Sequence, residues 1–523
     1  MATLAPGVKT GPYHAVLDHI HPEPTTFIRK YIFSIDAKVI GMQYFITAGI
    51  FFVIAGLLAE IIRTQLYSPS GAIVSAATYN SIYSMHGSAM VWLVVIPMLT
   101  GAFGNFVMPL MIGARDVAFP WLNLVAFWIF PVAGVILFSS FLFGAPDAGW
   151  TEYPPISLQG PPGTNLWCIA IFLVGISSTM TGINFLVTIF KMRAPGMTFT
   201  RMPLFVWAQF ATTPLLFIAT TALGAALAAL FIERVFGVPF YDPKRGGSPV
   251  LWQHMFWFYS HPAVYIMIIP GFGIISEVLP TFARKPIFGY KMIAFSSVAI
   301  ALLSFSVWAH HMFTSGMVPW LQLPFMIITM VIAIPTGVKI FSWIATLWGG
   351  SISWKTPALY AAGFLITFTY GGLTGFFLAA VPADYHEHGT YFVVAHFHYV
   401  LYGGSVMSMF AGFYYWWPKM TGRMYNEMLG KLHFWLTFVG FNLTFFPMHL
   451  IGLQGMPRRV AVYDPIYTFW NQFASISSFV LAGSMLLFLY NLFVSLRSGK
   501  KAGPNPWGAR TLEWMISSPA PYY

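Results

Sequence analysis

The sequence predicts an all-α protein that crosses a membrane about twelve times. Apolar runs of about 20 or more residues recur along the whole 523-residue chain, and each is long enough to span a bilayer as a helix. Only 8% of the residues are charged, whereas soluble domains have roughly 25%. Tyr and Trp lie near many run ends, as is typical of membrane interfaces. Composition therefore overrides the about three or four soluble domains that length alone would suggest.

The predicted helices follow one another in order. They cover residues 41–62, 82–110, 119–143, 164–190, 203–233, 250–279, 289–313, 317–345, 356–381, 389–417, 428–453 and 467–496. Turn signals such as GAPDAG, QGPPGT, PKRGG, WGGS and PKMTGR connect them. We expect an N-terminal arm over 1–40, a twelve-helix transmembrane domain over 41–497 and a C-terminal tail over 498–523.

The distribution of basic residues predicts the orientation. With twelve spans both termini lie on one side, and 19 of the 26 Lys and Arg residues belong to that side, 6 to the other and one, Lys339, to a span. This bias predicts that both termini lie in the cytoplasm. The net charge of +11 is mostly this topology signal and does not indicate nucleic-acid binding. The only cysteine, Cys168, excludes a disulfide framework, and we expect no secretory signal peptide.

Histidines inside the spans are the strongest functional signal. In YFVVAHFHYV, His396 and His398 are two residues apart, so on a helix they point about 200° apart and cannot bind one metal together. They can, however, bind two groups that flank the helix.

Four more histidines reach a similar depth, in the outer third of the membrane: His86, His261, His310 and His311. One alone would be read as a hydrogen-bonded core residue, but six at one depth favour a functional site. Imidazoles suit copper, iron and zinc, and the absence of a carboxylate or thiolate disfavours a mixed zinc site. Adjacent His310 and His311 need a local distortion to reach one metal. Tyr265 shares a helix face with His261.

These motifs resemble subunit I of the heme-copper terminal oxidases, of the cytochrome c oxidase type. The resemblance covers residues 36–497 and rests on SMHGSAM, GNFVMPLMIGARDVAFP, GWTEYPPIS, SHPAVY, WAHHMFTSG, PTGVKIFSW, VAHFHYV and GMPRR, in this order. It implies a subunit that reduces O2 to water with electrons from cytochrome c and translocates protons.

The resemblance also implies two heme A groups and a copper ion, copper B. His86 and His398 would be the axial ligands of a low-spin heme, His396 the ligand of a high-spin heme, and His261, His310 and His311 the copper ligands. Tyr265 would be cross-linked to His261. Arg458 and Arg459 match the pair that binds heme propionates, and Arg63 matches an arginine at a heme formyl group.

Two proton paths are implied in the same way. Lys339 and Thr336 match a path toward Tyr265. Asp116 matches the mouth of a second path, which would continue past these polar residues: Asn105, Asn123, Asn184, Ser177 and Ser178. Helix packing is the alternative reading of such small polar groups.

The chain departs from the family pattern in two places. Ala263 stands where many members have a glutamate two residues after the copper-ligand histidine, and Tyr259 and Ser260 resemble a bacterial subgroup that uses a Tyr-Ser pair instead. Gly389 replaces the aspartate of a magnesium site of which His388 is retained, so this site is in doubt unless Glu387 or Asp384 compensates.

The implied partners are a subunit II with a dinuclear copper, through which cytochrome c donates electrons, a subunit III and smaller subunits, besides O2, protons and the lipid bilayer. A quinol oxidase would share the same core. A nitric oxide reductase is disfavoured by Tyr265, Lys339 and Asp116 together. The alternative from another class is a twelve-span secondary transporter without hemes.

Overall fold

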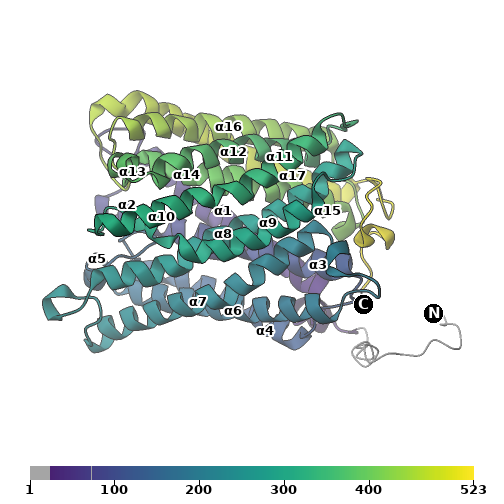
Figure 1. The fold of residues 1–523 in the computed structure, drawn as a ribbon, viewed down its shortest axis with the longest axis horizontal. Helices are drawn as coiled ribbons and strands as arrows, with labels where there is room; N and C mark the ends of the chain where they lie inside the picture. Colours follow the sequence, from purple (N-terminus) through teal and green to yellow (C-terminus); the bar gives the residue numbers. More distant parts are fainter. Residues whose placement is uncertain (1–23, 72, 523) are drawn as a thin grey trace, which may run out of the picture.

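The computed structural model describes residues 24–71 and 73–522, and in these ranges the regular secondary structure is helical apart from two isolated bridges. The long helices run nearly side by side along the length of the molecule (Figure 1). Ten helical stretches are long and apolar enough to cross a membrane within the described ranges. The predicted all-α membrane fold is confirmed.

The helices with their bounds are as follows: α1 Ala37–Gln65, α2 Ala76–Ser88, α3 Phe103–Ile112, α4 Pro120–Ser139, α5 Ile156–Gln159, α6 Gly163–Lys191, α7 Leu204–Phe236, α8 Pro249–Ala283, α9 Tyr290–Leu303, α10 Pro319–Val331, α11 Ala333–Leu347, α12 Thr356–Ala379, α13 Val381–Glu387, α14 Tyr391–Val400, α15 Met407–Thr421, α16 Glu427–Leu453 and α17 Thr468–Ser498. Two π-helical segments, η3 Ala89–Val95 and η4 Pro97–Ala102, join α2 to α3 into one span.

Three of the predicted spans are interrupted rather than continuous. The span predicted over 289–313 ends as an α-helix at Leu303 and continues as the 3₁₀ turns Ser304–Ser306 and η9, Trp308–Met312. The span over 389–417 contains a π-helical segment, η10, Leu401–Val406. The span over 317–345 divides at Ile332 into α10 and α11. Hydrophobic periodicity does not reveal such changes of helix type. The count of twelve spans stays a prediction, because the spans predicted over 289–313 and 389–417 are not among the ten stretches.

Polar caps fix several helix ends. Asp36 accepts hydrogen bonds from the backbone N–H groups of Lys38 and Val39 at the start of α1. Ser248 does the same for Leu251 in α8, and Asn426 for the first turn of α16. Each cap satisfies backbone donors that lack a partner within the helix.

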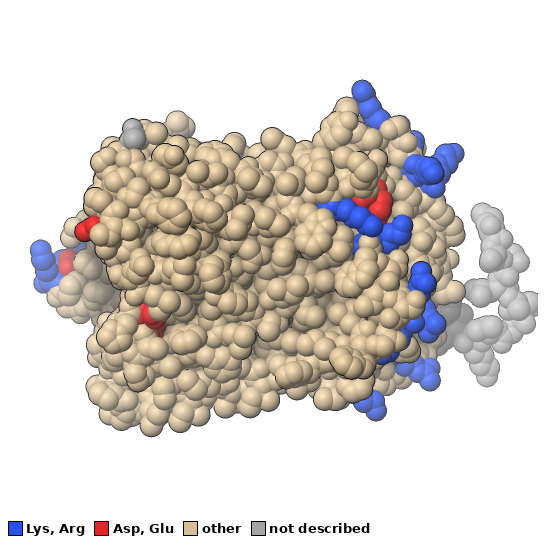
Figure 2. All heavy atoms as spheres, turned by 90° about the horizontal axis from the view of Figure 1, so that it is seen from above, with Lys and Arg blue, Asp and Glu red and all other residues tan. Residues whose placement is uncertain are grey.

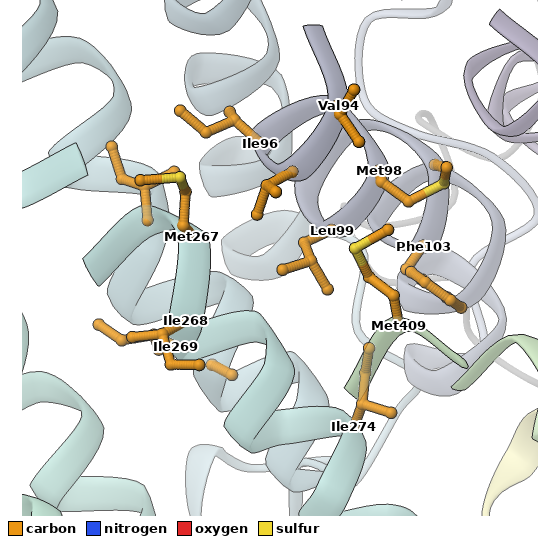
Figure 3. Packing of buried hydrophobic residues seen from close by; sticks show 14 of the residues in the cluster. Val94, Ile96, Met98, Leu99, Phe103, Met267, Ile268, Ile269, Ile274 and Met409 are labelled. Carbon is orange, nitrogen blue, oxygen red and sulfur yellow. The ribbon is translucent and has the colours of Figure 1, made fainter. Parts of the chain in front are cut away.

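The core is built where α8 meets the α2–α3 span and α15. Leu99 and Phe103 of that span lie beside Met409 of α15, and Ile274 of α8 lies next to Met409 (Figure 3). Small residues permit close approach of the helices. A side chain at Gly41 of α1, for example, would place its Cβ 2.9 Å from the carbonyl oxygen of Ala102.

Basic side chains gather at the end of the molecule where the described chain begins and ends. On the face in Figure 2, Lys and Arg cluster at this end, and the long belt between the two ends is almost free of charge. An uncharged belt between two charged ends is the surface that a bilayer requires.

The C-terminal tail folds back onto this same end of the bundle. The Nζ of Lys419, at the end of α15, donates to the carbonyl oxygens of Pro504, Ile516 and Ser517. Glu513 is buried, and its Oε1 accepts from the indole N–H of Trp416 and the hydroxyl of Thr511. The tail is therefore part of the packed domain.

Candidate functional site

A cavity of about 1160 Å³ lies inside the bundle and gathers most of the predicted site residues. Its wall is formed mainly by apolar side chains from α1, α2, α8, α11, α12, α14 and α17. The predicted site residues in the wall are His86, His261, His310, His311, His396, His398, Tyr265, Thr336, His388, Arg63, Arg458 and Arg459. A space of this size is far larger than a packing defect and is suited to large apolar ligands.

Three imidazoles converge in this wall. The Nδ1 of His261 lies 3.1 Å from the Nε2 of His311, and the Nε2 of His310 also lies 3.1 Å from that atom. One ring nitrogen of each residue falls within 4.8 Å of the other two, and no second group of three His, Cys, Asp or Glu meets this condition in residues 24–71 and 73–522. Metal–nitrogen bonds of about 2 Å fit this spacing. The three residues are therefore able to share one metal ion.

The expected local distortion at His310 and His311 is confirmed, because both lie in the 3₁₀ turn η9 and not in an α-helix. Two neighbours fix the rings. The Nδ1 of His310 lies 3.0 Å from the hydroxyl of Thr329 on α10. The ring of His311 stacks on Trp257 of α8, with 3.6 Å between ring centroids and 12° between the planes.

His396 and His398 contact different helices from opposite faces of α14, as the 200° argument predicts. The Nδ1 of His396 lies 3.0 Å from the carbonyl oxygen of Gly371 and 3.1 Å from the hydroxyl of Thr374, both on α12. His398 stacks on Phe445 of α16 at 4.1 Å. The two rings thus reach the cavity wall from opposite faces of the helix.

The tautomers of three histidines follow from their hydrogen bonds. The Nδ1 atoms of His86, His396 and His398 lie 2.8–3.0 Å from the backbone carbonyl oxygens of Ala55, Gly371 and Val394, respectively. A carbonyl only accepts, so each Nδ1 carries the proton and each Nε2 keeps a free lone pair. Metal-binding histidines commonly donate the N–H of their other ring nitrogen in this way, which fixes the ring orientation. The donor set therefore fits iron ligation.

Three arginines line the cavity, and the guanidinium group of one of them lacks part of its hydrogen-bond partners. Arg63 is buried, and its Nη2 donates to Asn471 and Ser475, but its Nε and Nη1 have no partner. Burial and the neighbouring Arg459 lower the pKa of Arg458 to about 10. Buried guanidinium groups of this kind are suited to acidic or carbonyl groups of a ligand in the cavity.

Tyr265 and His261 are neighbours, with 4.8 Å between ring centroids, and the Nε2 of His261 is buried without a partner. Thr336 reaches the cavity from α11. Lys339, one turn further on, is fully buried and does not line the cavity. Its Nζ donates to the carbonyl oxygen of Ile293 on α9 instead.

Asp116, the first residue of the second predicted path, lies just after the end of α3. The Oδ1 of Asp116 accepts from the N–H groups of Ala37 and Val117, whereas its buried Oδ2 has no partner. Burial, with a further contribution from Asp36, raises the pKa of Asp116 to about 7.

Beyond Asp116, the amide of Asn123 donates to the Oδ1 of Asn105 at 2.7 Å. Asn184 binds both backbone polar groups of Phe119, and the hydroxyl of Ser177 donates to the carbonyl oxygen of Ala126. Ser178 is half-buried on the same helix, α6. These bonds also serve helix packing.

Tyr259 and Ser260 are buried on α8 next to His261 but do not line the cavity. The hydroxyl of Ser260 has no partner. Ala263, where a glutamate is common in the family, is buried as well.

His388 pairs with a carboxylate, since its Nδ1 lies 3.0 Å from the Oδ2 of Asp384, and both residues line the cavity. Glu387 is also buried, and its Oε2 has no partner. Burial raises the pKa of Glu387. Gly389 has a positive φ of 77°, which favours glycine.

Sequence reasoning missed one acidic residue of the cavity wall, Glu60 of α1. Its Oε2 accepts from the hydroxyl of Ser478 on α17. A carboxylate inside the predicted span 41–62 was the available signal, because ionisable groups in membrane spans are rare. Trp257, which supports His311, had no comparable signal.

The comparisons with known proteins agree with this site. The family described as cytochrome C and quinol oxidase polypeptide I matches residues 39–495. Cytochrome c oxidase subunit 1 of Thermostichus vulcanus is 52% identical over 500 residues, which are 95% of this chain and 91% of the relative. The protein of the same name from Synechocystis is 54% identical over 490 residues, with coverages of 94% and 89%.

Among solved structures, a heme-copper terminal oxidase dimer has the same fold. One of its chains matches with a TM-score of 0.73 and 19% sequence identity, over 93% of this chain and 87% of that chain.

Proposed function

The chain belongs to the cytochrome c and quinol oxidase polypeptide I family, and on this basis we propose that it is the catalytic subunit of a respiratory terminal oxidase. It reduces O2 to water with electrons from cytochrome c and couples this reaction to proton translocation. The observation that carries the proposal is the convergence of three histidines within 4.8 Å in a cavity that also holds His86, His396 and His398.

The six histidines divide into three ligand sets. His261, His310 and His311 hold copper B, His86 and His398 hold the iron of a low-spin heme, and His396 holds the iron of a high-spin heme. When bound, these groups relay electrons and bind O2 for reduction. The Nδ1 hydrogen bonds of His86, His396 and His398 support this division, because they orient each ring and leave one nitrogen for iron.

Polar side chains around the cavity complete the site. Arg458 and Arg459 bind heme propionates, and Arg63 contacts the formyl group of heme A, which is the heme type that we assign. Tyr265 donates a proton and an electron to the reaction and is cross-linked to His261. The unpartnered Nε2 of His261 supports this pairing.

Protons reach the site from the terminal end by two paths. Lys339 delivers them past Thr336 to Tyr265. Asp116 admits them to the second path, which follows Asn105, Asn123, Asn184, Ser177 and Ser178. Tyr259 and Ser260 replace the family's glutamate near the end of that path. The pKa of Asp116, about 7, supports its role, because a carboxyl with this pKa both takes up and releases protons near neutral pH.

The setting of the subunit follows from the same reasoning. It lies in a bacterial inner membrane with its N-terminal arm and C-terminal tail in the cytoplasm. Subunit II brings the dinuclear copper and receives electrons from cytochrome c, and subunit III and smaller subunits complete the complex. His388 and Asp384 offer a nitrogen and a carboxylate for a magnesium site despite Gly389.

A spectroscopic experiment tests the function. A reduced-minus-oxidised spectrum of the purified complex should show two hemes, and pyridine extraction should identify both as heme A. Oxygen consumption should follow the addition of reduced cytochrome c and not of a quinol. A purified protein without heme absorbance would refute the proposal. That result would favour the alternative of a secondary transporter without hemes.

A further inference from the structure

The loop before α5 buries a carboxylate that the proposed function does not use. Glu152 has 0% of its surface exposed, although it lies in the connection between α4 and α6. Its φ of 42° is unusual for a residue other than glycine and is held by a turn in which its N–H donates to the carbonyl oxygen of Gly149. The turn keeps Glu152 out of the cavity wall, whereas Thr151 and Tyr153 line the cavity.

Only half of this carboxylate is satisfied. Its Oε1 accepts from the N–H of Ala148 at 3.2 Å, and its Oε2 is buried without a partner. The carbonyl oxygen of Ala148 accepts from the Nη1 of Arg459 at 3.4 Å, and the Nη2 of Arg459 donates to Thr151. The backbone of Ala148 therefore links Glu152 to the arginine that borders the cavity.

Further buried oxygens without partners belong to the same connection or to the first turn of α6. They are the Oδ1 of Asp147, the Oγ of Ser157 and the Oγ1 of Thr164. A Cβ at Gly160 would lie 3.1 Å from the Oγ1 of Thr164 and 3.5 Å from the Oδ1 of Asp147, so these two oxygens border one space. Buried polar atoms in native proteins are bound by ordered water when no protein group reaches them.

Arginines on both sides balance the charge of the carboxylates. Arg234, at the end of α7, donates to the carbonyl oxygens of Ser157, Gly160 and Pro161. The titratable groups around Glu152 are Asp147, Arg234, Arg459, Tyr83 and Cys168. Since two guanidinium groups already compensate two carboxylates, a metal cation is not required here.

These surroundings set the proton affinity of Glu152. Burial and the neighbouring Asp147 raise its pKa to about 8, and the N–H of Ala148, Arg234 and Arg459 act in the opposite direction. A carboxyl with this pKa exchanges its proton near neutral pH, where an ordinary glutamate is fully ionised.

We propose that Glu152 is a proton-holding group on the side of the membrane opposite the chain termini. Its carboxylate accepts a proton that leaves the cavity beside Arg459 and releases it to water that is reached past Asp147, Ser157 and Thr164. An O–H bond forms at Oε2 and the same bond breaks again, so that one proton passes and no electron is exchanged. The inference rests on the proposed function, because it assigns a release route to the translocated protons.

The test uses the complete oxidase complex in phospholipid vesicles. In Glu152→Gln, which keeps the shape of the side chain and removes its proton exchange, heme spectra and oxygen consumption should persist. The acidification of the outer medium after a pulse of reduced cytochrome c should be lost. Asp242→Asn removes a solvent-accessible carboxylate on the same side and should change neither quantity.

Two further measurements keep the test decisive. The infrared band of a protonated carboxylic acid should shrink in the parent complex between about pH 6 and about pH 9, and this change should be smaller in Glu152→Gln, where Asp116 still titrates in this range. If that variant does not assemble, Thr164→Val, which removes one unpartnered hydroxyl of the route, should reduce acidification with unchanged spectra.

The outcomes separate the two proposals. Parent-like acidification in Glu152→Gln would overturn the role of Glu152. So would a change of the carboxylic acid band with pH that is as large in Glu152→Gln as in the parent. Loss of oxygen consumption with intact heme spectra would overturn it too, because Glu152 would then serve the chemistry itself. A parent complex that consumes no oxygen would instead refute the proposed function.

Discussion

The ammonium group of Lys339 lies 2.6 Å from the hydroxyl of Ser297, on the neighbouring helix α9, and is fully buried. No carboxylate pairs with it in the contacts of the described chain. A buried lysine without a counter-ion is costly in a membrane span and indicates a function rather than a packing role.

We therefore expect Lys339→Met to slow turnover about 10-fold or more while heme and copper contents stay unchanged, because a proton path loses its relay group. Oxygen consumption and metal analysis of the purified complex provide the measurement. Lys355→Met, at an exposed lysine near the start of α12, is the matched control and should retain parent activity. Equal turnover in the two variants would remove Lys339 from the path.

Substitution of the two histidines of α14 should separate the two hemes. His398→Ala should remove the low-spin heme spectrum and leave carbon monoxide binding at the other heme. His396→Ala should do the reverse. The reason is that the two rings lie against different helices, α16 and α12. Optical spectra with and without carbon monoxide provide the measurement, and loss of the same heme in both variants would contradict the assignment.

Copper binding should depend on His311. His311→Asn should remove copper and nearly all oxygen reduction, because only two imidazoles of the cluster remain. His254 is the matched control, since it lies on α8 near the cluster but its Nδ1 accepts from Trp308 instead. His254→Asn should keep parent copper content by elemental analysis. Full copper occupancy in His311→Asn would place the ion elsewhere.

Tyr259→Phe tests the Tyr-Ser substitution for the missing glutamate. The exchange removes only a hydroxyl, so the packing loss should stay below about 1.5 kcal/mol. Oxygen reduction should slow with unchanged heme spectra, and adding Ala263→Glu should restore part of the rate. Turnover and proton release in vesicles are measured together. Parent values of both in Tyr259→Phe would leave the hydroxyl without a role in proton transfer.

The pKa of Asp116 makes a prediction about pH. Because burial raises this pKa from 3.8 to about 7 in the folded protein, ionisation of Asp116 costs the folded state free energy between these values as pH rises. Asp116→Asn avoids this cost. Its thermal stability relative to the parent should therefore increase from about pH 4 to about pH 7 and then stay constant.

The turnover of Asp116→Asn relative to that of the parent should fall over the same pH range, because proton uptake is impaired in the variant. Thermal melting and oxygen consumption at several pH values measure the two effects. A stability difference that does not change with pH would mean that Asp116 is ionised throughout.

The sequence predicted the fold and the histidine constellation because both depend on strong local signals. Long apolar runs indicate spans, and intramembrane histidines are rare enough to indicate a site. The 3₁₀ turn at His310 and the π-helical segment after His398 change only hydrogen-bond spacing, which side-chain patterns do not specify.

The residues that hold the site histidines in place could not be predicted from the sequence either. Trp257 under His311 and the carbonyl of Gly371 beside His396 are contacts between segments distant in sequence. Glu152 was hidden for another reason, since a polar residue in a connection is expected to be exposed, and only the packed structure reveals its burial.

The docking of the C-terminal tail has a consequence for biosynthesis. The three carbonyl groups that surround the ammonium of Lys419 belong to Pro504, Ile516 and Ser517, which follow Lys419 in the chain by 85, 97 and 98 residues and are therefore translated later. Until then this end of α15 lacks these partners, and the pocket of Glu513 is open to water. The terminal end of the bundle thus closes only after residues 504–517 have been translated, so a polypeptide that stops before them would expose a recognisable defect to the proteases that remove incomplete membrane proteins.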